Sequence, residues 1–395
     1  MKILRPIIIL VVFVFSFQMQ GKSQIFSFQS ASEISNFTNH NGINQDGNLA
    51  LCRDMKGNVW AVLGHTNMGG LKIWKGSSVD NMIYKYDAAL NFKLGAAGIA
   101  FNNINYPDGP KSRGQVWPFG LYIGSTGKFY CYIHNETGWA SGGTGYTING
   151  QFEGEPDFRH IGLMTSLDSG RTWNFDGWII TSSEKSFTTK YLPEPELTGA
   201  QVGPQYSLGA GDHSLFVNPN DKYMYLFYTK IYINSAGKGH TDSIYVARAP
   251  KNNPTIWTKW YKGGWGQSGN SGKESAVIGH YGYGPSVAWS TYLNKYILIS
   301  MYRPVWNPSS KTGICALQMS VCNDWKNQNW ASPQLVKSFP GDSTIIPSAY
   351  WTICNTDSSG NIKVVGKTFR LFHNLWANDV KKIDITTNYL NEVKR

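Results

Sequence analysis

The chain has 395 residues and a formal net charge of +11, from 36 lysines and arginines against 25 acidic residues. The basic residues are scattered singly, which argues against a nucleic-acid-binding tail, because such tails carry runs of like charge. The 42 glycines and the 14% of aromatic residues are typical of a protein with many turns and many packed or ligand-facing rings, and no long stretch is rich in helix-forming residues.

The first residues predict an exported protein. A short basic start precedes the apolar run 7–17, which has the length of a signal-peptide core and is shorter than the roughly 20 residues that a transmembrane helix needs. We expect cleavage near Ser23, so that residues 1–23 are a signal peptide and residues 24–395 form one mature domain, secreted or periplasmic. An N-terminal membrane anchor is the alternative, and no other segment is apolar enough to span a bilayer.

The five cysteines form neither a disulfide framework nor a metal motif. Their number is odd, no two stand at C-x-x-C spacing, and several fall on apolar strand-like runs, where a free cysteine packs as a small hydrophobic residue. One disulfide is compatible with an oxidising compartment. The cysteines are Cys52, Cys131, Cys315, Cys322 and Cys354.

One pattern recurs along the chain: an apolar strand, a turn of glycine, asparagine or aspartate, and a second strand rich in aromatic and β-branched residues. It occupies residues 46–66, 118–137, 212–231, 282–302 and, more loosely, 348–366. A second hairpin is predicted after each of the first four units, at residues 82–92, 161–173, 243–257 and 314–330. Two hairpins per unit make a four-stranded blade.

We therefore predict an all-β chain that folds as a β-propeller of five four-stranded blades, with seven shorter blades as the alternative. Repeat architectures permit a single domain of about 370 residues, because each repeat carries its own part of the core. The last unit lacks a clear second hairpin, so the ring would be closed by residues 382–386 or by the mature N-terminus at residues 25–28.

Residues 166–173 match the Asp-box S-x-D-x-G-x-T-W at every fixed position. In this turn the aspartate caps backbone amides, the glycine permits the turn and the tryptophan packs between strands. We interpret the motif as evidence for a propeller hairpin and not as a catalytic site.

In a propeller, ligands bind where the innermost strands and their loops converge on one end of the central channel. The first strand of each unit is predicted to be innermost, so the residues at its start face the channel mouth. Two of these starts carry an acid, Asp46 and Asp212, and we predict that both are catalytic. A third acid would come from a loop, with Glu274 as our choice and Glu153, Glu155 and Asp157 as further candidates. The alternative role of each acid is to cap a hairpin or to lie in solvent.

Other polar and aromatic residues near the same loops are predicted to bind substrate. A histidine can orient substrate or serve as a base, and an arginine can pair with a carboxylate. The candidates are His65, Arg113, Trp117, His134, His213, Tyr281 and Arg303. No pair of histidines has the spacing of a helical metal site, so we expect no metal and no cofactor at the site, and at most a structural calcium ion.

Three segments resemble five-bladed glycoside hydrolases, a group that includes arabinanases, β-xylosidases and endo-D-arabinanase-like enzymes. They are Asp46-Gly47 with Trp60 and 64–66, the strand 244–249, and 284–287 with 292–296. The resemblance covers most of the mature chain as a pattern, and it implies hydrolysis of a glycosidic bond by acids on the inner strands. It implies that Asp46 acts as base or nucleophile and that Asp212 takes the role of the middle-blade acid. The second unit has no acid at its inner-strand start, so the expected set of three carboxylates is incomplete unless a loop supplies one.

The sequence thus predicts a glycoside hydrolase acting on a polysaccharide or oligosaccharide, and the diffuse positive charge would suit an acidic one. A solvated basic surface is the favoured explanation of the charge. Two other functions stay open: a polysaccharide lyase that abstracts a proton beside a uronate with His or Tyr, and a non-catalytic carbohydrate-binding propeller. We expect a monomer without a nucleic-acid partner and without a membrane span.

Overall fold

The computed structural model describes residues 26–30, 34–36, 45–66, 69–92, 115–136, 159–183, 205–234, 240–279, 282–307, 312–339, 350–356, 360–375 and 379–389. All regular structure in these ranges is β-strand, so the all-β prediction is confirmed there. Within the same ranges, no helix has the length and apolar character needed to cross a membrane. The predicted signal segment, residues 1–23, lies outside the described residues.

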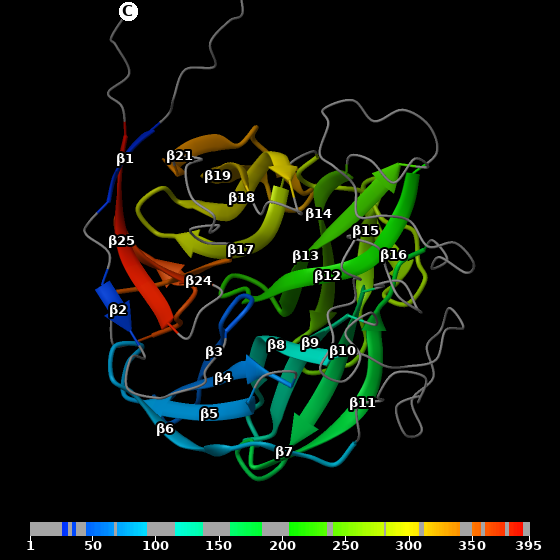
Figure 1. Cartoon of the computed structure of the whole chain (residues 1–395), viewed down its shortest axis with the longest axis vertical. Coiled ribbons are helices and arrows are strands. Elements are labelled where there is room, and N and C mark those ends of the chain that lie inside the picture. The colour runs from blue at the N-terminus through cyan, green and yellow to red at the C-terminus, as the bar shows by residue number, and fades with distance from the viewer. Residues whose placement is uncertain are drawn as a thin grey trace, which may run out of the picture.

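The strands pair mainly into antiparallel sheets, and the N-terminal strands join the last of these sheets (Figure 1). One parallel pair, Arg159 with Gly209, links the second sheet to the third. The first sheet contains β3 (Ala50–Arg53), β4 (Val59–His65), β5 (Gly70–Gly76) and β6 (Met82–Asp87). The second contains β8 (Gln115–Ile123), β9 (Phe129–Glu136), β10 (Arg159–Ser166) and β11 (Thr172–Ile180), with the short β7 (Ala89–Leu90) in parallel at its edge.

The third sheet contains β12 (Gln205–Val217), β13 (Tyr223–Asn234), β14 (His240–Pro250), β15 (Thr258–Tyr261) and β16 (Gly264–Ser268). The fourth contains β17 (Gly282–Ser290), β18 (Lys295–Asn307), β19 (Thr312–Asp324), β20 (Asn329–Trp330) and β21 (Gln334–Phe339), with β23 (Val364–Val365) in parallel beside β17. The last contains β22 (Trp351–Cys354), β24 (Thr368–Leu375), β25 (Asp379–Tyr389), β1 (Phe26–Ser30) and β2 (Ile34–Asn36).

Both segments proposed to close the ring belong to this last sheet. β25 pairs with β24, and the N-terminal β1 pairs with β25 from Phe26 opposite Tyr389 to Ser30 opposite Ile385. The two ends of the described chain are therefore joined by backbone hydrogen bonds.

The predicted hairpin over residues 82–92 is wrong. β6 pairs instead with β5, and β7 pairs in parallel with β11 of the second sheet. Only Ala88 separates β6 from β7, and one residue cannot reverse the chain into a hairpin, whose shortest common loop has two residues. The first hairpin of the opening unit is found as predicted, with Gly57 at φ +85° in the turn between β3 and β4.

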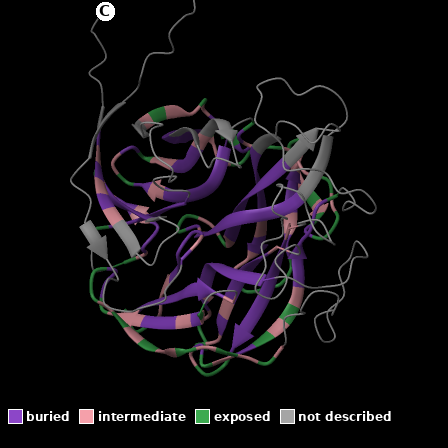
Figure 2. Cartoon of the chain, viewed as in Figure 1, coloured by how far each residue is buried: buried purple, intermediate pink, exposed green. Residues whose placement is uncertain are grey.

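Apolar side chains fill the space between consecutive sheets, which gives the protein a propeller-like arrangement around a centre (Figure 1). Trp173 and Ile73 pack between the first and second sheets, and Trp351 with Ile297 between the fourth and the last. A further cluster joins the last sheet to the first. Figure 2 shows the strands nearest the centre as buried over most of their length. The number of blades stays a prediction.

The strands β3, β8, β12, β17 and β22 follow one another around this centre as neighbours, and the Leu49 backbone N, just before β3, donates to the Thr352 hydroxyl on β22 (2.8 Å). The buried side chain of Asn48, just before β3, connects three of them. Its Nδ2 donates to the backbone oxygens of His213 (3.0 Å) and Pro285 (3.1 Å), and its Oδ1 accepts a hydrogen bond from the Thr352 hydroxyl (3.3 Å). These bonds satisfy backbone oxygens that are buried away from water.

The Asp-box forms the turn between β10 and β11. Asp168 accepts hydrogen bonds from the Thr172 backbone N (2.9 Å) and the Ser166 hydroxyl (2.7 Å). Partial loss of solvent raises the pKa of the Asp168 carboxyl, but these hydrogen bonds outweigh it and lower the pKa to about 2. Trp173 is fully buried, and its Nε1 donates to the Gly170 oxygen (2.9 Å). The four cysteines whose side chains the structure describes are free thiols.

Replacing Trp173 by alanine should lower the free energy of unfolding by about 3–5 kcal/mol, because the change leaves a large cavity between the first two sheets. Leu167→Ala, in the same turn with a side chain that is 83% exposed, should change it by less than about 0.5 kcal/mol. Chemical denaturation of both variants checks this, and equal effects would contradict the packing role of Trp173.

Candidate functional site

The candidate site lies at the start of β3 and near the middle of β12, so Asp212 does not stand at the start of its strand as predicted. Asp46 lies just before β3, in a loop held by the buried side chain of Gln45, whose Oε1 accepts a hydrogen bond from the Gly64 backbone N (2.9 Å) and whose Nε2 donates to the Asn48 oxygen (3.2 Å). Gly47 has φ +151°, and a Cβ atom there would lie 1.6 Å from Cε1 of Phe119. The ring of Phe119 therefore requires a glycine after Asp46.

Asp212 is placed by an irregular stretch of β12. The pairing of β12 with β13 shifts register between Ser207 and Ala210 and again between Gly211 and Ser214. Such bulges re-aim side chains and occur next to active sites. Asp212 itself has φ +45°, an uncommon conformation for a residue with a Cβ, and residues held in such conformations cluster at active sites.

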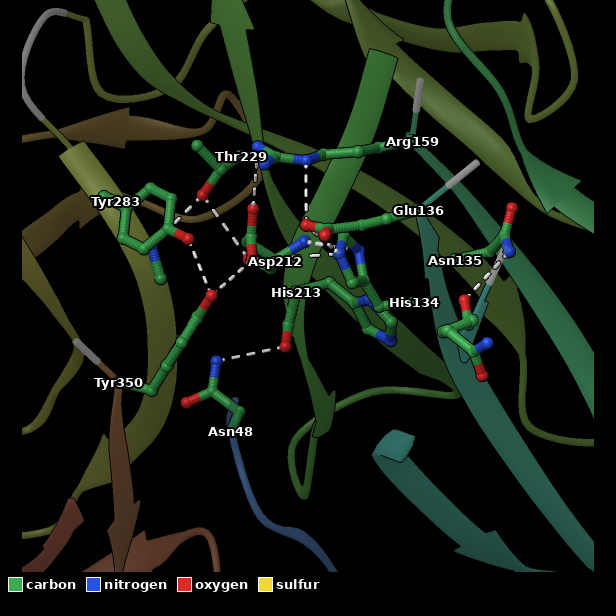
Figure 3. A network of polar contacts seen from close by, with 12 residues as sticks. Asn48, His134, Asn135, Glu136, Arg159, Asp212, His213, Thr229, Tyr283 and Tyr350 are labelled. Atoms are coloured by element: carbon green, nitrogen blue, oxygen red, sulfur yellow. Dashed lines mark hydrogen bonds and ion pairs between the residues drawn. The ribbon is translucent and has the colours of Figure 1, made fainter. Parts of the chain in front are cut away.

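A histidine, a glutamate and an arginine from the second sheet surround Asp212 (Figure 3). His134 Nδ1 accepts a hydrogen bond from the Asp212 backbone N (3.1 Å), so its proton lies on Nε2, which faces Glu136 Oε1 at 3.0 Å. Arg159 pairs with both acids, through Nε to Glu136 Oε1 (3.1 Å) and through Nη1 to Asp212 Oδ2 (3.4 Å).

Two tyrosines complete the surroundings of Asp212 (Figure 3). The Tyr350 hydroxyl donates to Asp212 Oδ1 (2.7 Å), and the Tyr283 hydroxyl lies 2.6 Å from that of Tyr350. The Thr229 hydroxyl donates to the Asp212 backbone oxygen (3.4 Å). Burial, then the charge of Asp212 and the neighbouring Tyr283, raise the pKa of Tyr350 well above its usual value, so this phenol is a hydrogen-bond donor and a poor base.

The carboxyl group of Asp46 is the unusual titratable group of the cluster. Burial, reinforced by the negative charges of Glu136 and Asp212, raises its pKa from 3.8 to about 7, while His134 and Arg159 act in the opposite direction. Its Oδ1 is buried and has no hydrogen-bond partner within the described part of the chain. A carboxyl group with this pKa exchanges protons at neutral pH, which is the property of a general acid or base.

Ligand atoms of His134, Glu136 and Asp212 lie within 4.8 Å of one another, so this set has the residue types of a metal site. Arg159, however, already places its guanidinium against the two carboxylates. A cation bound there would face this positive charge at short range, which opposes binding. The donor set therefore does not fit a metal ion while Arg159 holds this position.

Aromatic rings form one wall beside these acids. The His65 ring stacks on Trp117 with centroids 5.4 Å apart, and His134 stacks on Phe119 with centroids 5.1 Å apart. Burial lowers the pKa of His65 to about 4, so this histidine is neutral at physiological pH. Burial also lowers the pKa of His213 well below its usual value, and its Nε2 lies 3.3 Å from the Tyr132 oxygen.

Of the residues predicted from sequence, the structure brings together Asp46, Asp212, His65, Trp117, His134 and His213. It does not bring Glu274 to this cluster. Glu274 binds Lys230, Lys259 (2.6 Å) and the Tyr228 hydroxyl (2.7 Å). Tyr228 and Lys230 alternate with Thr229 along β13, so they point to the opposite face of that strand from the residue that contacts Asp212.

Arg113 and Tyr281 lie outside the described residues, and Arg303 lies on β18 without a described side chain.

Sequence reasoning missed Glu136, Arg159 and Tyr350. Glu136 stands two residues after His134 on β9, and side chains two apart share one face of a strand. The sequence therefore could have predicted that this acid lies beside His134. Arg159 and Tyr350 had no such signal, because their contacts with Asp212 span 53 and 138 residues of sequence.

No protein-family model matches the chain, and no curated protein sequence is similar to it. Among solved structures, it is similar to an α-L-arabinofuranosidase from Lactobacillus brevis at 13% identity and a TM-score of 0.45, over 88% of this chain and 91% of that one. It is also similar to an endo-1,5-α-L-arabinanase from Thermotoga petrophila at 11% identity and a TM-score of 0.44, over 88% and 72%. A protein of unknown function from Dyadobacter fermentans matches at 12% identity and a TM-score of 0.42, over 86% and 76%.

Two of these solved structures are glycoside hydrolases, the class of enzyme that the sequence also resembles. With TM-scores of 0.42 to 0.45 the similarity is one of general outline. We therefore infer the chemistry from the side chains of this chain.

The raised pKa of Asp46 makes stability depend on pH in a defined direction. The folded-state pKa of about 7 lies above the ordinary 3.8, so the folded form binds the extra proton between these values. Relative to Asp46→Asn, the wild type should be most stable below pH 4 and lose up to about 1.4 kcal/mol per pH unit as the pH rises towards 7.

Chemical denaturation of the two proteins between pH 5 and 8 measures this difference. Asp324→Asn is the control, because the exposed Asp324 has a lowered pKa and does not titrate in that range. Parallel pH curves for the wild type and Asp46→Asn would contradict a raised pKa at Asp46.

Proposed function

We propose that the protein is a secreted glycoside hydrolase that cleaves a polysaccharide or oligosaccharide with Asp46 as its proton-transfer group. The observation that carries the proposal is the carboxyl cluster of Asp46, Glu136 and Asp212, in which Asp46 has a pKa of about 7. Glycoside hydrolysis needs one carboxyl group that gives up a proton and a second that acts as base or nucleophile. Neighbouring acids with separated pKa values suit this division of roles.

In this proposal Asp46 is the general acid. Its protonated form is still populated at neutral pH, so it can donate a proton to the oxygen of the leaving sugar. This role differs from the base or nucleophile role that the family resemblance implies, and the raised pKa is the reason for the change. After the bond breaks, the ionised Asp46 is surrounded by two other carboxylates, which favours its reprotonation.

Glu136 is the second carboxylate of the proposal. Its side chain is 12% exposed, whereas that of Asp212 is 1% exposed. Asp212 has Oδ1 bound by Tyr350 and Oδ2 paired with Arg159, so both of its oxygens are engaged. We therefore assign Asp212 a positioning role: it orients Arg159 and contributes the negative charge that keeps Asp46 protonated.

The proposal also includes a five-bladed propeller that acts as a monomer after cleavage of its signal peptide. Apolar clusters between consecutive sheets, together with the cluster that joins the last sheet to the first, support the count of five. The apolar segment 7–17 supports export.

The lyase alternative receives less support from the described residues. A lyase needs a cation to neutralise the uronate, and Arg159 is already paired with two acids. It also needs a base. Burial lowers the pKa of His65 to about 4 and that of His213 well below its usual value, which makes both weak bases, and the raised pKa of Tyr350 makes this phenol a poor base.

A panel of polysaccharides, including arabinans, xylans and uronate-containing polymers, tests the reaction class. Hydrolysis should produce new reducing ends without ultraviolet absorbance. New ends with the absorbance of an unsaturated uronate would instead establish a lyase, and saturable binding without products would establish a carbohydrate-binding protein.

Asp46→Asn should reduce turnover by roughly 10²–10⁴-fold, which is the usual contribution of a general acid. Wild-type activity should fall as the pH rises through about 7, because Asp46 then ionises. Asp324→Asn, on an exposed turn, should keep wild-type turnover and serves as the carboxyl-to-amide control.

The direction of the pH dependence separates the two roles of Asp46. A loss of activity as the pH falls through 7 would assign it the proton-accepting role, and wild-type turnover in a folded Asp46→Asn variant would overturn the proposal as a whole.

A further inference from the structure

A cavity opens at the far end of the inner strands, away from the carboxyl cluster. β3 begins beside Asp46 and ends at Arg53, and β12 carries Asp212 near its middle and ends at Val217. The cavity is lined by the ends of these strands and of β8, together with the segment 360–363. It therefore lies on the side of the propeller-like arrangement opposite to the carboxyl cluster.

This cavity has the size of a small-molecule site. Its volume is about 390 Å³, within the usual range of about 300–1,000 Å³ for ligand pockets. The floor is apolar and buried, and it includes Leu121, Leu215 and Ile362. Met55, which is 84% exposed, stands at the rim.

The charges that line the cavity are mostly positive: Arg53, Lys251 and Lys363 against Asp54. Asp54 is engaged in its own turn, where it accepts hydrogen bonds from the Asn58 backbone N (2.8 Å) and from Nε1 of Trp60 (2.8 Å). Asp54 stays negative but forms no ion pair with these three cations in the described part of the chain, so the lining keeps an excess of positive charge.

Lys363 is the deepest of these cations, with a residue exposure of 7%. Its Nζ donates to the Ile353 oxygen (2.8 Å) and to the Ser286 hydroxyl (3.3 Å), and both of these partners are neutral. An ammonium group has three protons to donate. No carboxylate pairs with Lys363 in the ranges that the structure describes.

Arg53 is a second cation in the lining whose hydrogen-bonding capacity is only partly used. Its Nε donates to the Gly360 oxygen (2.8 Å) and its Nη1 to the Ser77 oxygen (3.2 Å), so its fork is held by neutral backbone groups. Its Nη2 is buried and has no hydrogen-bond partner among the described residues. A buried donor of this kind is costly unless a partner satisfies it.

We propose that this cavity binds a small molecule with an apolar body and a single carboxylate, such as a medium-chain fatty acid. The apolar floor would accept the body, and the positive charges of Arg53, Lys251 and Lys363 in the lining would attract the acid. A sugar is a poorer match, because its hydroxyl groups would meet the leucine and isoleucine side chains of the floor without partners. This ligand site is separate from the carboxyl cluster and does not depend on the proposed hydrolase activity.

Calorimetric titration with octanoate tests the proposal, with octan-1-ol and octylammonium as matched probes. Octanoate should bind the wild type at one site with a Kd on the order of 0.1–1 mM, as expected for a ligand of this size. Octan-1-ol should bind at least tenfold more weakly, and octylammonium should not bind. Equal binding of octanoate and octan-1-ol, or no binding of octanoate, would overturn the proposal.

Two variants locate the site. Lys363→Met should weaken octanoate binding at least tenfold, and Val217→Trp should block it by filling the cavity, which also covers the case in which Lys363→Met does not fold. Lys85→Met removes an exposed lysine that does not line the cavity and should leave binding unchanged. Unchanged affinity in folded Val217→Trp, or saturable binding of inorganic phosphate in place of octanoate, would contradict the assignment.

Discussion

The buried side chain of Asn48 is the contact on which the centre of the protein depends. The inner strands β12 and β17 both carry register shifts near their starts, and a shifted strand leaves backbone oxygens without partners in the sheet. Asn48 supplies the missing donors to His213 and Pro285 and receives a hydrogen bond from Thr352. A single amide thus ties the segment before β3 to the third, fourth and last sheets.

The electrostatics of the site follow from this convergence. Asp46 arrives from the first sheet, Glu136 and Arg159 from the second, and Asp212 from the third, so charges far apart in sequence share a buried space. Three carboxylates face one arginine, and in a poorly solvated site this excess of negative charge is relieved when one acid binds a proton. Asp46 takes the proton because Asp212 and Glu136 are paired with Arg159.

The two ends of the inner strands differ in chemistry. At their starts, bulges and glycines bring acids and aromatic rings together, with Gly47 and Gly211 making room for Phe119 and His134. At their ends, regular pairing closes into tight turns, and apolar side chains line a cavity together with three cations that bind mainly neutral oxygens. The bulged backbone thus lies at the proposed reaction site, whereas the regularly paired strand ends form the cavity that we propose as a ligand-binding site.

Local patterns were enough for the sequence to predict an all-β chain, the positions of the leading hairpins and the acids Asp46 and Asp212, because strand alternation and turn chemistry act over a few residues. The hairpin over residues 82–92 failed because only Ala88 separates β6 from β7, and the two strands pair with different partners, β5 and β11. Glu136, Arg159 and Tyr350 became part of the site only through tertiary structure, since each meets Asp212 or its partners across dozens of residues. The raised pKa of Asp46 likewise has no sequence signal, because burial and the charges of residues on other sheets produce it.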